Sequence, residues 1–156
     1  MSAFRRRSEA ARAIGDLSGL LARPALSLYR GGMVVGQPFR PDWWGKARRA
    51  ALSLRATTLG ARGAGHSVYV ILLHDPRRSE PWGVYVGQTS RDPDLRFDQH
   101  KAGYKASGAA RRFGVRLLPD LVEHLNPMRR WEAAELEAAL AEAFLAAGVP
   151  WVEGGH

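Results

Sequence analysis

The chain has 156 residues, enough for one domain or for one small domain with an appendage. It contains no cysteine, which excludes disulfides and thiolate metal sites, and it has no apolar run of about 18 residues, so no segment is predicted to cross a bilayer. The formal net charge is +8 and is concentrated at one end, because residues 1–65 hold 12 Lys and Arg against 3 Asp and Glu, while residues 66–156 hold 11 against 12.

The first part of the chain, residues 1–65, is predicted to be a basic and mainly helical extension. Residues 1–23 repeat apolar side chains at three- and four-residue steps, which is typical of an amphipathic helix with an apolar face of Ala10, Ile14, Leu17 and Leu21. A glycine- and proline-rich stretch follows, and Asp42 can cap a second helix near 43–58. Because the positive charge attracts phosphate or anionic lipid, we expect this extension to bind nucleic acid; docking of its first helix on a membrane or a partner protein is the alternative.

The N-terminal residues also bear on location. They lack the continuous apolar segment of a secretory signal, and the chain lacks cysteine, so we expect a cytoplasmic protein. An arginine-rich and acid-poor start also occurs in organelle transit peptides, which stay the alternative.

The second part, residues 66–156, is predicted to be a separate domain of strands and helices. Residues 67–73 and 83–88 are rich in β-branched and aromatic side chains, and the short loop between them predicts an antiparallel hairpin. Asp92 and Pro93 can start a helix over 93–102, which Gly103 ends.

Further elements are expected after this helix. A short helix is predicted within 106–113, and residues 115–124 are a third strand candidate that Pro119 interrupts. Asn126 and Pro127 predict the start of a long helix, which runs to about Ala147. Three strands and about three helices indicate the α+β class.

No single residue in this part looks catalytic, but an ordered set of side chains does. Tyr69 and Tyr85 lie on the two hairpin strands, where their phenols can share one face. Arg96 and His100 are four residues apart on one helix face, and Glu137 lies on the last helix. Hydrolysis of a phosphodiester needs an activated water and neutralisation of phosphate charge, which a phenol near a cation or base, an arginine and a carboxylate-bound metal can supply.

The order of these residues resembles the GIY-YIG nuclease superfamily over about residues 67–152. Val68-Tyr69 stands at the position of the first family motif, and Tyr85-Val86-Gly87 matches the second. The helix with Arg96 and His100 and the glutamate-rich run around Glu137 are similar to the arginine-bearing and metal-binding helices of the family.

The resemblance implies a small sheet of three antiparallel strands flanked by helices. It also implies an endonuclease that hydrolyses DNA with one divalent ion, Mg²⁺ or Mn²⁺; RNA is the open alternative substrate. Tyr69 would be the general base or a phenol that orients water, and Tyr85 would bind the phosphate or assist proton movement. Arg96 would stabilise phosphate charge and His100 would support the base. Glu137 would hold the metal.

A further group of residues is expected to contact the nucleic acid. Gly87 would let the substrate approach the backbone. A basic stretch with one aromatic side chain follows His100, and its expected phosphate contacts are Lys101, Lys105, Arg111 and Arg112. A solvated surface is the alternative for this stretch.

The chain departs from the family pattern at two places. Ser67 replaces a glycine of the first motif, and a family asparagine that follows the metal-binding helix has no counterpart, because the only asparagine is Asn126. Glu153 and His156 are candidates to replace it. These departures keep a second function open, a catalytically inactive nucleic-acid-binding protein of the same fold.

Overall fold

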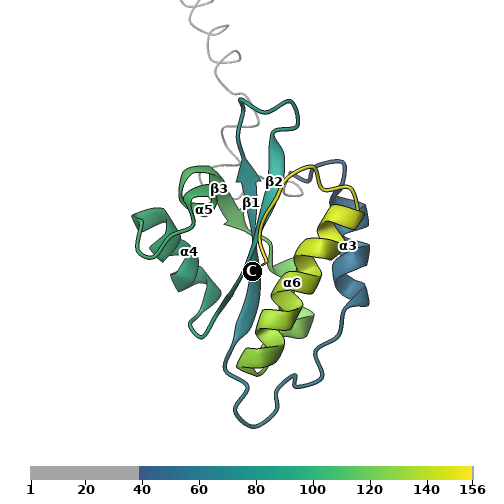
Figure 1. Ribbon diagram of the computed structural model, residues 1–156, viewed down its shortest axis with the longest axis vertical. Helices are drawn as coiled ribbons and strands as arrows, with labels where there is room; N and C mark the ends of the chain where they lie inside the picture. The colour runs from purple at the N-terminus through teal and green to yellow at the C-terminus, as the bar shows by residue number, and fades with distance from the viewer. Residues whose placement is uncertain (1–38, 156) are drawn as a thin grey trace, which may run out of the picture. The chain divides into compact units, whose positions relative to one another are not determined.

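The computed structural model describes residues 39–155 (Figure 1). The expectations for residues 1–38, including the first amphipathic helix, and for His156 lie outside the described residues. From Arg40 onward the chain forms one compact unit. In this described part, none of the helices has both the length and the apolar character that a membrane span requires.

A four-stranded mixed sheet lies at the centre of the unit (Figure 1). β1 (Ser67–His74) pairs with β2 (Trp82–Thr89) as the predicted antiparallel hairpin. β3 (Gly114–Leu117) is antiparallel to β1, and β4 (Val152–Gly154) is parallel to β2. The strand order is β3-β1-β2-β4, and the α+β class is confirmed.

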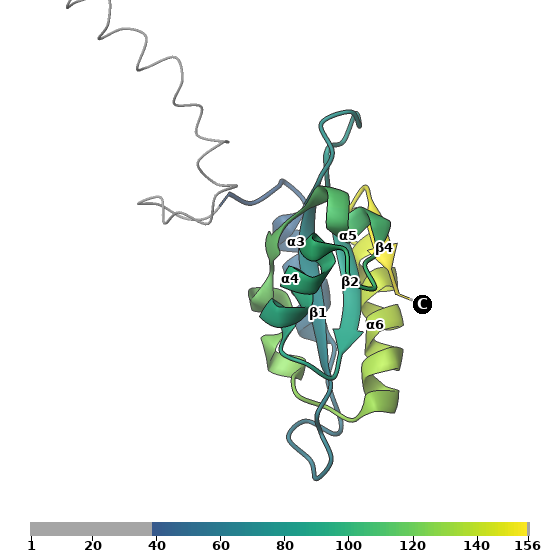
Figure 2. The same ribbon diagram turned by 90° about the vertical axis from the view of Figure 1, so that its left-hand side faces the viewer.

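The expectation of only three antiparallel strands is wrong in two respects. The third strand is shorter than the pattern predicts: β3 ends before the 3₁₀ turns η1 (Pro119–Leu121) and η2 (Glu123–Leu125), since proline has no N–H to offer a strand ladder. The fourth strand, β4, has only three residues, which is too few to show the alternation of apolar and polar side chains by which a strand is predicted from sequence. It forms because the last helix returns the chain to the free edge of β2 (Figure 2).

Helices cover both faces of this sheet (Figure 1). On one face lie α4 (Pro93–Ala102) and α5 (Gly108–Phe113), and on the other lies α6 (Arg130–Ala146) with α3 (Trp44–Ser53) beside it. β1 is therefore buried on both faces, and its alternate side chains enter two separate cores. Val68, Val70 and Leu72 belong to the core under α6, while Tyr69, Ile71 and Leu73 belong to the core beside α4 and α5.

The helix predicted over 93–102 is confirmed as α4, and its two ends follow from the sequence. The Asp92 carboxylate accepts hydrogen bonds from the backbone N–H of Asp94 at 2.8 Å and of Leu95 at 3.3 Å. Gly103 ends the helix in the left-handed region, with φ 88°. Both signals are local, so the sequence alone is enough to set this helix.

The start of α6 corrects a prediction, because the helix begins at Arg130 and not at Pro127. Asn126 does not cap it. The Asn126 side chain instead accepts from the backbone N–H of Val68 at 2.9 Å and donates to the carbonyl of Val68 at 2.8 Å. The amide thereby acts as a strand partner for β1, a long-range role that no sequence pattern indicates.

Helix α3, which the sequence places in the N-terminal extension, packs in the main core with α6. Its buried side chains include Trp44, Ala47 and Ala51. The chain after α3 is held by Glu132, whose carboxylate accepts hydrogen bonds from the backbone N–H and the hydroxyl of both Thr57 and Thr58. Residues 40–65 thus share a compact unit and a core with the sheet.

Candidate active site

The centre of the candidate site is a hydrogen bond between Tyr69 of β1 and His100 of α4. The Tyr69 hydroxyl oxygen lies 2.8 Å from His100 Nε2, and the two side chains belong to residues that are 2% and 0% exposed. The backbone N–H of Ser107 donates to His100 Nδ1 at 3.2 Å. Since Nδ1 accepts, a neutral His100 carries its proton on Nε2 and donates it to the phenol oxygen. The hydrogen-bond network therefore assigns the tautomer.

The electrostatic surroundings keep this imidazole neutral. Burial, and secondarily the positive charge of Arg96, lower the pKa of His100 from 6.5 to about 4. At neutral pH His100 is therefore an uncharged hydrogen-bond donor to Tyr69. It supports the phenol by position and not by removing its proton, because Nε2 already carries one.

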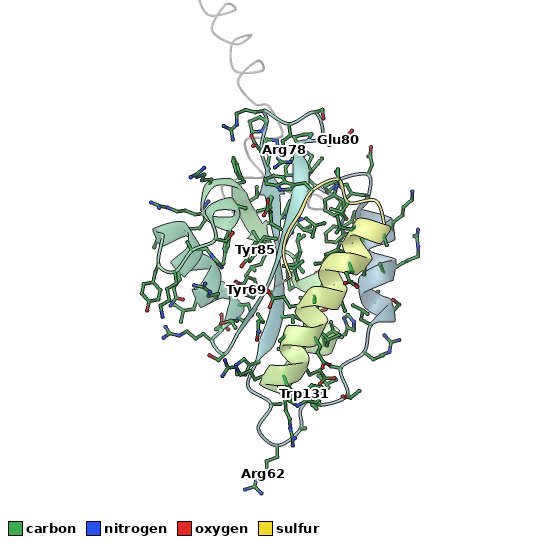
Figure 3. All side chains as sticks on the ribbon, viewed as in Figure 1. Arg62, Tyr69, Arg78, Glu80, Tyr85 and Trp131 are labelled. Atoms are coloured by element: carbon green, nitrogen blue, oxygen red, sulfur yellow. The ribbon has the colours of Figure 1, made fainter. Side chains whose placement is uncertain are left out.

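The second phenol, Tyr85 of β2, completes an aromatic cluster. Its ring centroid is 6.1 Å from that of Tyr69 and 5.3 Å from that of His100, where the rings meet edge to face. Figure 3 shows Tyr69 and Tyr85 next to one another at the centre of the unit. In the hairpin Ile71 pairs with Tyr85, and Tyr69 lies two residues before Ile71 on β1. Since side chains alternate between the two faces of a strand, both phenols lie on the same face of the sheet, as predicted.

Gly87 makes room for this cluster. It lies opposite Tyr69 on β2 and is buried. A Cβ atom at position 87 would come within 2.6 Å of the Tyr69 ring and hydroxyl and within 2.9 Å of the Tyr85 ring. The phenols therefore fill the space beside this backbone, and the contact of Gly87 with the substrate stays a prediction.

Arg96 lies one helical turn before His100, and the following loop holds its guanidinium. The guanidinium donates to the carbonyl of Tyr104 at 3.2 Å and to that of Lys105 at 2.8 Å. Lys105 has φ 43°, a conformation that costs a non-glycine residue on the order of 1 kcal/mol. The loop that ends α4 thus fixes both Arg96 and, through Ser107, His100.

The two phenols titrate above their ordinary range. Burial, and then the neighbouring Tyr85, raise the pKa of Tyr69, whereas the charge of Arg96 acts in the opposite direction. Burial also raises the pKa of Tyr85, and so does the negative charge of Glu137. Both phenols are therefore protonated at neutral pH unless further positive charge enters the site.

The last of the expected residues, Glu137, reaches the site from the layer of helices on the other face of the sheet. It lies on α6, is 8% exposed, and its charge acts on the Tyr85 phenol. Its neighbours on the helix differ: Glu135 is exposed, and Glu132 binds Thr57 and Thr58. The structure thus distinguishes the surroundings of these three glutamates, which the sequence alone does not tell apart.

The donor set can be compared with what a divalent ion needs. Among residues 39–155 there is no cluster of three or more histidine and acidic side chains suited to a metal. Mg²⁺ commonly uses one or two carboxylates and completes its shell with water and substrate phosphate. Glu137, a buried carboxylate whose charge acts on the Tyr85 phenol, fits such a one-carboxylate site. Glu153 pairs with Tyr85 in the β4–β2 register, and its Oε1 accepts from Trp151 Nε1 at 2.9 Å.

The residues expected to contact nucleic acid are placed in different surroundings. Lys101 donates to the backbone carbonyls of Arg111 at 3.1 Å and of Gly114 at 2.9 Å, which joins α4 to the end of α5. Arg111 and Arg112 are exposed on α5. Lys105 lines a pocket together with Arg96.

This pocket also contains functional candidates that sequence reasoning missed. Arg91 and Arg130 line it, together with the amides of Gln88 and Gln99. Arg91 could have been found, because it follows directly after the strand of the second motif in a polar run. Arg130 carries no such signal, since only the packing of α6 brings it near α4.

Comparison with known proteins finds no matching family model, no matching curated protein and no matching solved structure. The likeness to GIY-YIG nucleases therefore rests on the residues described above.

Proposed function

We propose that this protein is a metal-dependent endonuclease that hydrolyses phosphodiester bonds of DNA. The observation that supports it most is the Tyr69–His100 hydrogen bond, with the histidine tautomer held by Ser107, next to Arg96. An aromatic packing cluster needs no fixed tautomer and no neighbouring guanidinium. Both features suit a site that orients water beside a phosphate.

In the proposed reaction a water attacks the phosphorus and releases a proton to the solvent, while the bond to the leaving oxygen breaks and this oxygen takes up a proton from the solvent. We assign the orientation of this water to the Tyr69 hydroxyl in its neutral form, because burial raises its pKa. His100 Nε2–H fixes the rotation of that hydroxyl. Arg96 faces the negative charge that the phosphate gains in the transition state.

Glu137 would hold the divalent ion, Mg²⁺ or Mn²⁺. Such an ion supplies positive charge to the phosphate and to the leaving oxygen. Tyr69 and Glu137 both act on the pKa of Tyr85, and we assign the Tyr85 hydroxyl a hydrogen bond to the phosphate. The basic residues of the N-terminal part would add affinity that does not depend on DNA sequence.

The second candidate function is nucleic-acid binding without catalysis. It is favoured by the finding that residues 39–155 hold no cluster of three or more histidine and acidic side chains suited to a metal. It predicts binding that is independent of metal and no cleavage under any metal condition.

Plasmid cleavage with Mg²⁺, with Mn²⁺ and with a chelator tests the proposal. We expect metal-dependent nicking or cutting, and a loss of at least about 100-fold in Glu137→Gln and in Arg96→Ala. Glu135→Gln is the matched control, because Glu135 is exposed on the same helix, and it should cut at the unchanged rate. Equal rates for the unchanged protein, Glu137→Gln and Arg96→Ala would exclude the assignment.

A further inference from the structure

A basic pocket lies next to the candidate active site, between the end of β2, helix α4 and the start of α6. Its volume is about 620 Å³. Among residues 39–155 no carboxylate lines it, and its basic side chains come from separate segments of the chain: His66, Arg91, Arg96, Lys105 and Arg130. Arg96 belongs both to this pocket and to the candidate active site.

The placement of these cations is electrostatically unfavourable for the protein by itself. Arg130 is the first residue of α6, and a helix N-terminus carries partial positive charge that repels a cation. In the described part of the chain, the ion pairs join Arg40 to Asp120 and Arg77 and Arg78 to Asp75, so they neutralise none of the pocket's cations. Like charges gathered around one cavity without acidic partners indicate an anion-binding site.

The remaining lining of the pocket suits a nucleotide better than a bare phosphate. Tyr104 is 53% exposed at the pocket and follows the end of α4. An exposed phenol ring beside cations can stack a base, and stacking is worth about 1–3 kcal/mol per base. The amides of Gln88 and Gln99 add donors and acceptors for the edge of a base.

We propose that this pocket binds the nucleic-acid strand next to the bond that is cut. Arg91 and Arg130 hold a phosphate that flanks the scissile one, and Tyr104 stacks the adjoining unpaired base. The inference rests on the proposed function, because the shared Arg96 places the two phosphates on one strand. The substrate is then a nucleic acid with an unpaired nucleotide beside the cleavage site.

Binding of a labelled single-stranded oligonucleotide of about eight nucleotides, measured by fluorescence anisotropy with a chelator present, tests this subsite. We expect Arg91→Gln and Arg130→Gln each to weaken binding about 3- to 10-fold. Each should also reduce the slope of log affinity against log salt by about 0.7. Arg129→Gln is the matched control, since Arg129 is exposed next to Arg130 but does not line the pocket, and it should bind within about 2-fold of the unchanged protein.

A second series tests the base. Tyr104→Ala should weaken oligonucleotide binding by about 5-fold or more, while Tyr104→Phe keeps the ring and should bind normally. Inorganic phosphate should compete poorly at the same phosphate concentration. Competition by inorganic phosphate as strong as by the oligonucleotide would overturn the assignment to a strand, and so would equal binding by the Arg91, Arg130 and Arg129 variants.

The same proteins separate this inference from the proposed function. If the Arg91 and Arg130 variants lose binding while no metal supports cleavage, the pocket stands and the nuclease assignment fails. If the unchanged protein cuts with metal while these variants bind and cut normally, the nuclease assignment stands and the pocket is overturned. Glu137→Gln should bind the oligonucleotide normally in the chelator, because the pocket does not include Glu137.

Discussion

Gly87 lies opposite Tyr69 on the neighbouring strand, and a Cβ atom at position 87 would lie 2.6 Å from the Tyr69 hydroxyl oxygen. The absence of a side chain at Gly87 is thus what allows the two phenols to lie over the sheet. This relationship connects a single glycine of the second motif to the hydrogen bond between Tyr69 and His100.

Gly87→Ala should therefore displace the phenols and reduce both stability and cleavage. We expect a loss of about 1–3 kcal/mol in the free energy of unfolding, as for other overpacked cores, measured by urea denaturation. Gly108→Ala is the matched control, because a Cβ atom there has no neighbour within 4 Å. A Gly87→Ala protein with unchanged stability and unchanged cleavage would show that the cluster adapts without cost.

The buried His100 predicts a specific dependence of stability on pH. Its pKa is lowered to about 4 in the folded protein, against 6.5 for an ordinary histidine, so between these values the unfolded chain binds more protons. The free energy of unfolding should therefore fall as the pH falls from 6.5 to about 4, by on the order of 2 kcal/mol from this residue.

Urea denaturation at pH 7 and pH 4.5 measures this effect against His100→Gln, which keeps a side-chain donor but does not titrate. The unchanged protein should lose more stability than the variant over this interval. An equal loss in both proteins would contradict a lowered pKa at His100.

Glu132 is expected to support the fold and not the chemistry. Burial raises its pKa, but hydrogen bonds from Thr58 and Thr57 outweigh this and hold the pKa at about 2. Glu132→Gln replaces one acceptor by a donor that faces these N–H and hydroxyl groups. It should lower the free energy of unfolding by about 1–3 kcal/mol.

Thermal or urea denaturation checks this prediction, with Glu135→Gln as the exposed control on the same helix. Cleavage per folded molecule should stay unchanged in Glu132→Gln. A stable Glu132→Gln protein that has lost cleavage would instead indicate that Glu132 belongs to the metal site.

The position of α3 predicts the outcome of truncation. The compact unit begins at Arg40, so a protein that starts at residue 40 should fold cooperatively and keep the candidate active site. A protein that starts at residue 66 lacks Trp43 and helix α3, and with them the core side chains of Trp43, Trp44, Ala47 and Ala51. It should lose several kcal/mol and fail to fold, since large buried side chains contribute about 3–5 kcal/mol each.

Circular dichroism and urea denaturation of the two proteins test this difference. A cooperative transition in the protein that starts at residue 66 would show that α3 is dispensable. The protein that starts at residue 40 should also bind DNA with a smaller salt dependence than the full chain, because it lacks the arginines of the first residues.

The local elements of this protein were predictable from the sequence. The hairpin and α4 follow from β-branched runs, from the Asp92 cap and from Gly103, all of which act within a few residues. The candidate residues Tyr69, Arg96 and His100 could be named on the same basis. The periodicity of strands and helices, which is visible in the sequence, indicates which of these side chains share a face.

Tertiary packing decided the rest, because the deciding contacts join residues far apart in the chain. β4 exists only beside β2, and Asn126 serves β1 instead of capping a helix. Glu132 and Glu137 are the same residue type on one helix, yet Glu132 binds backbone N–H groups while the charge of Glu137 acts on Tyr85. Arg130 lines the basic pocket for the same reason. The role of each charged side chain depends on its burial and on its distance from other groups, and a sequence states neither.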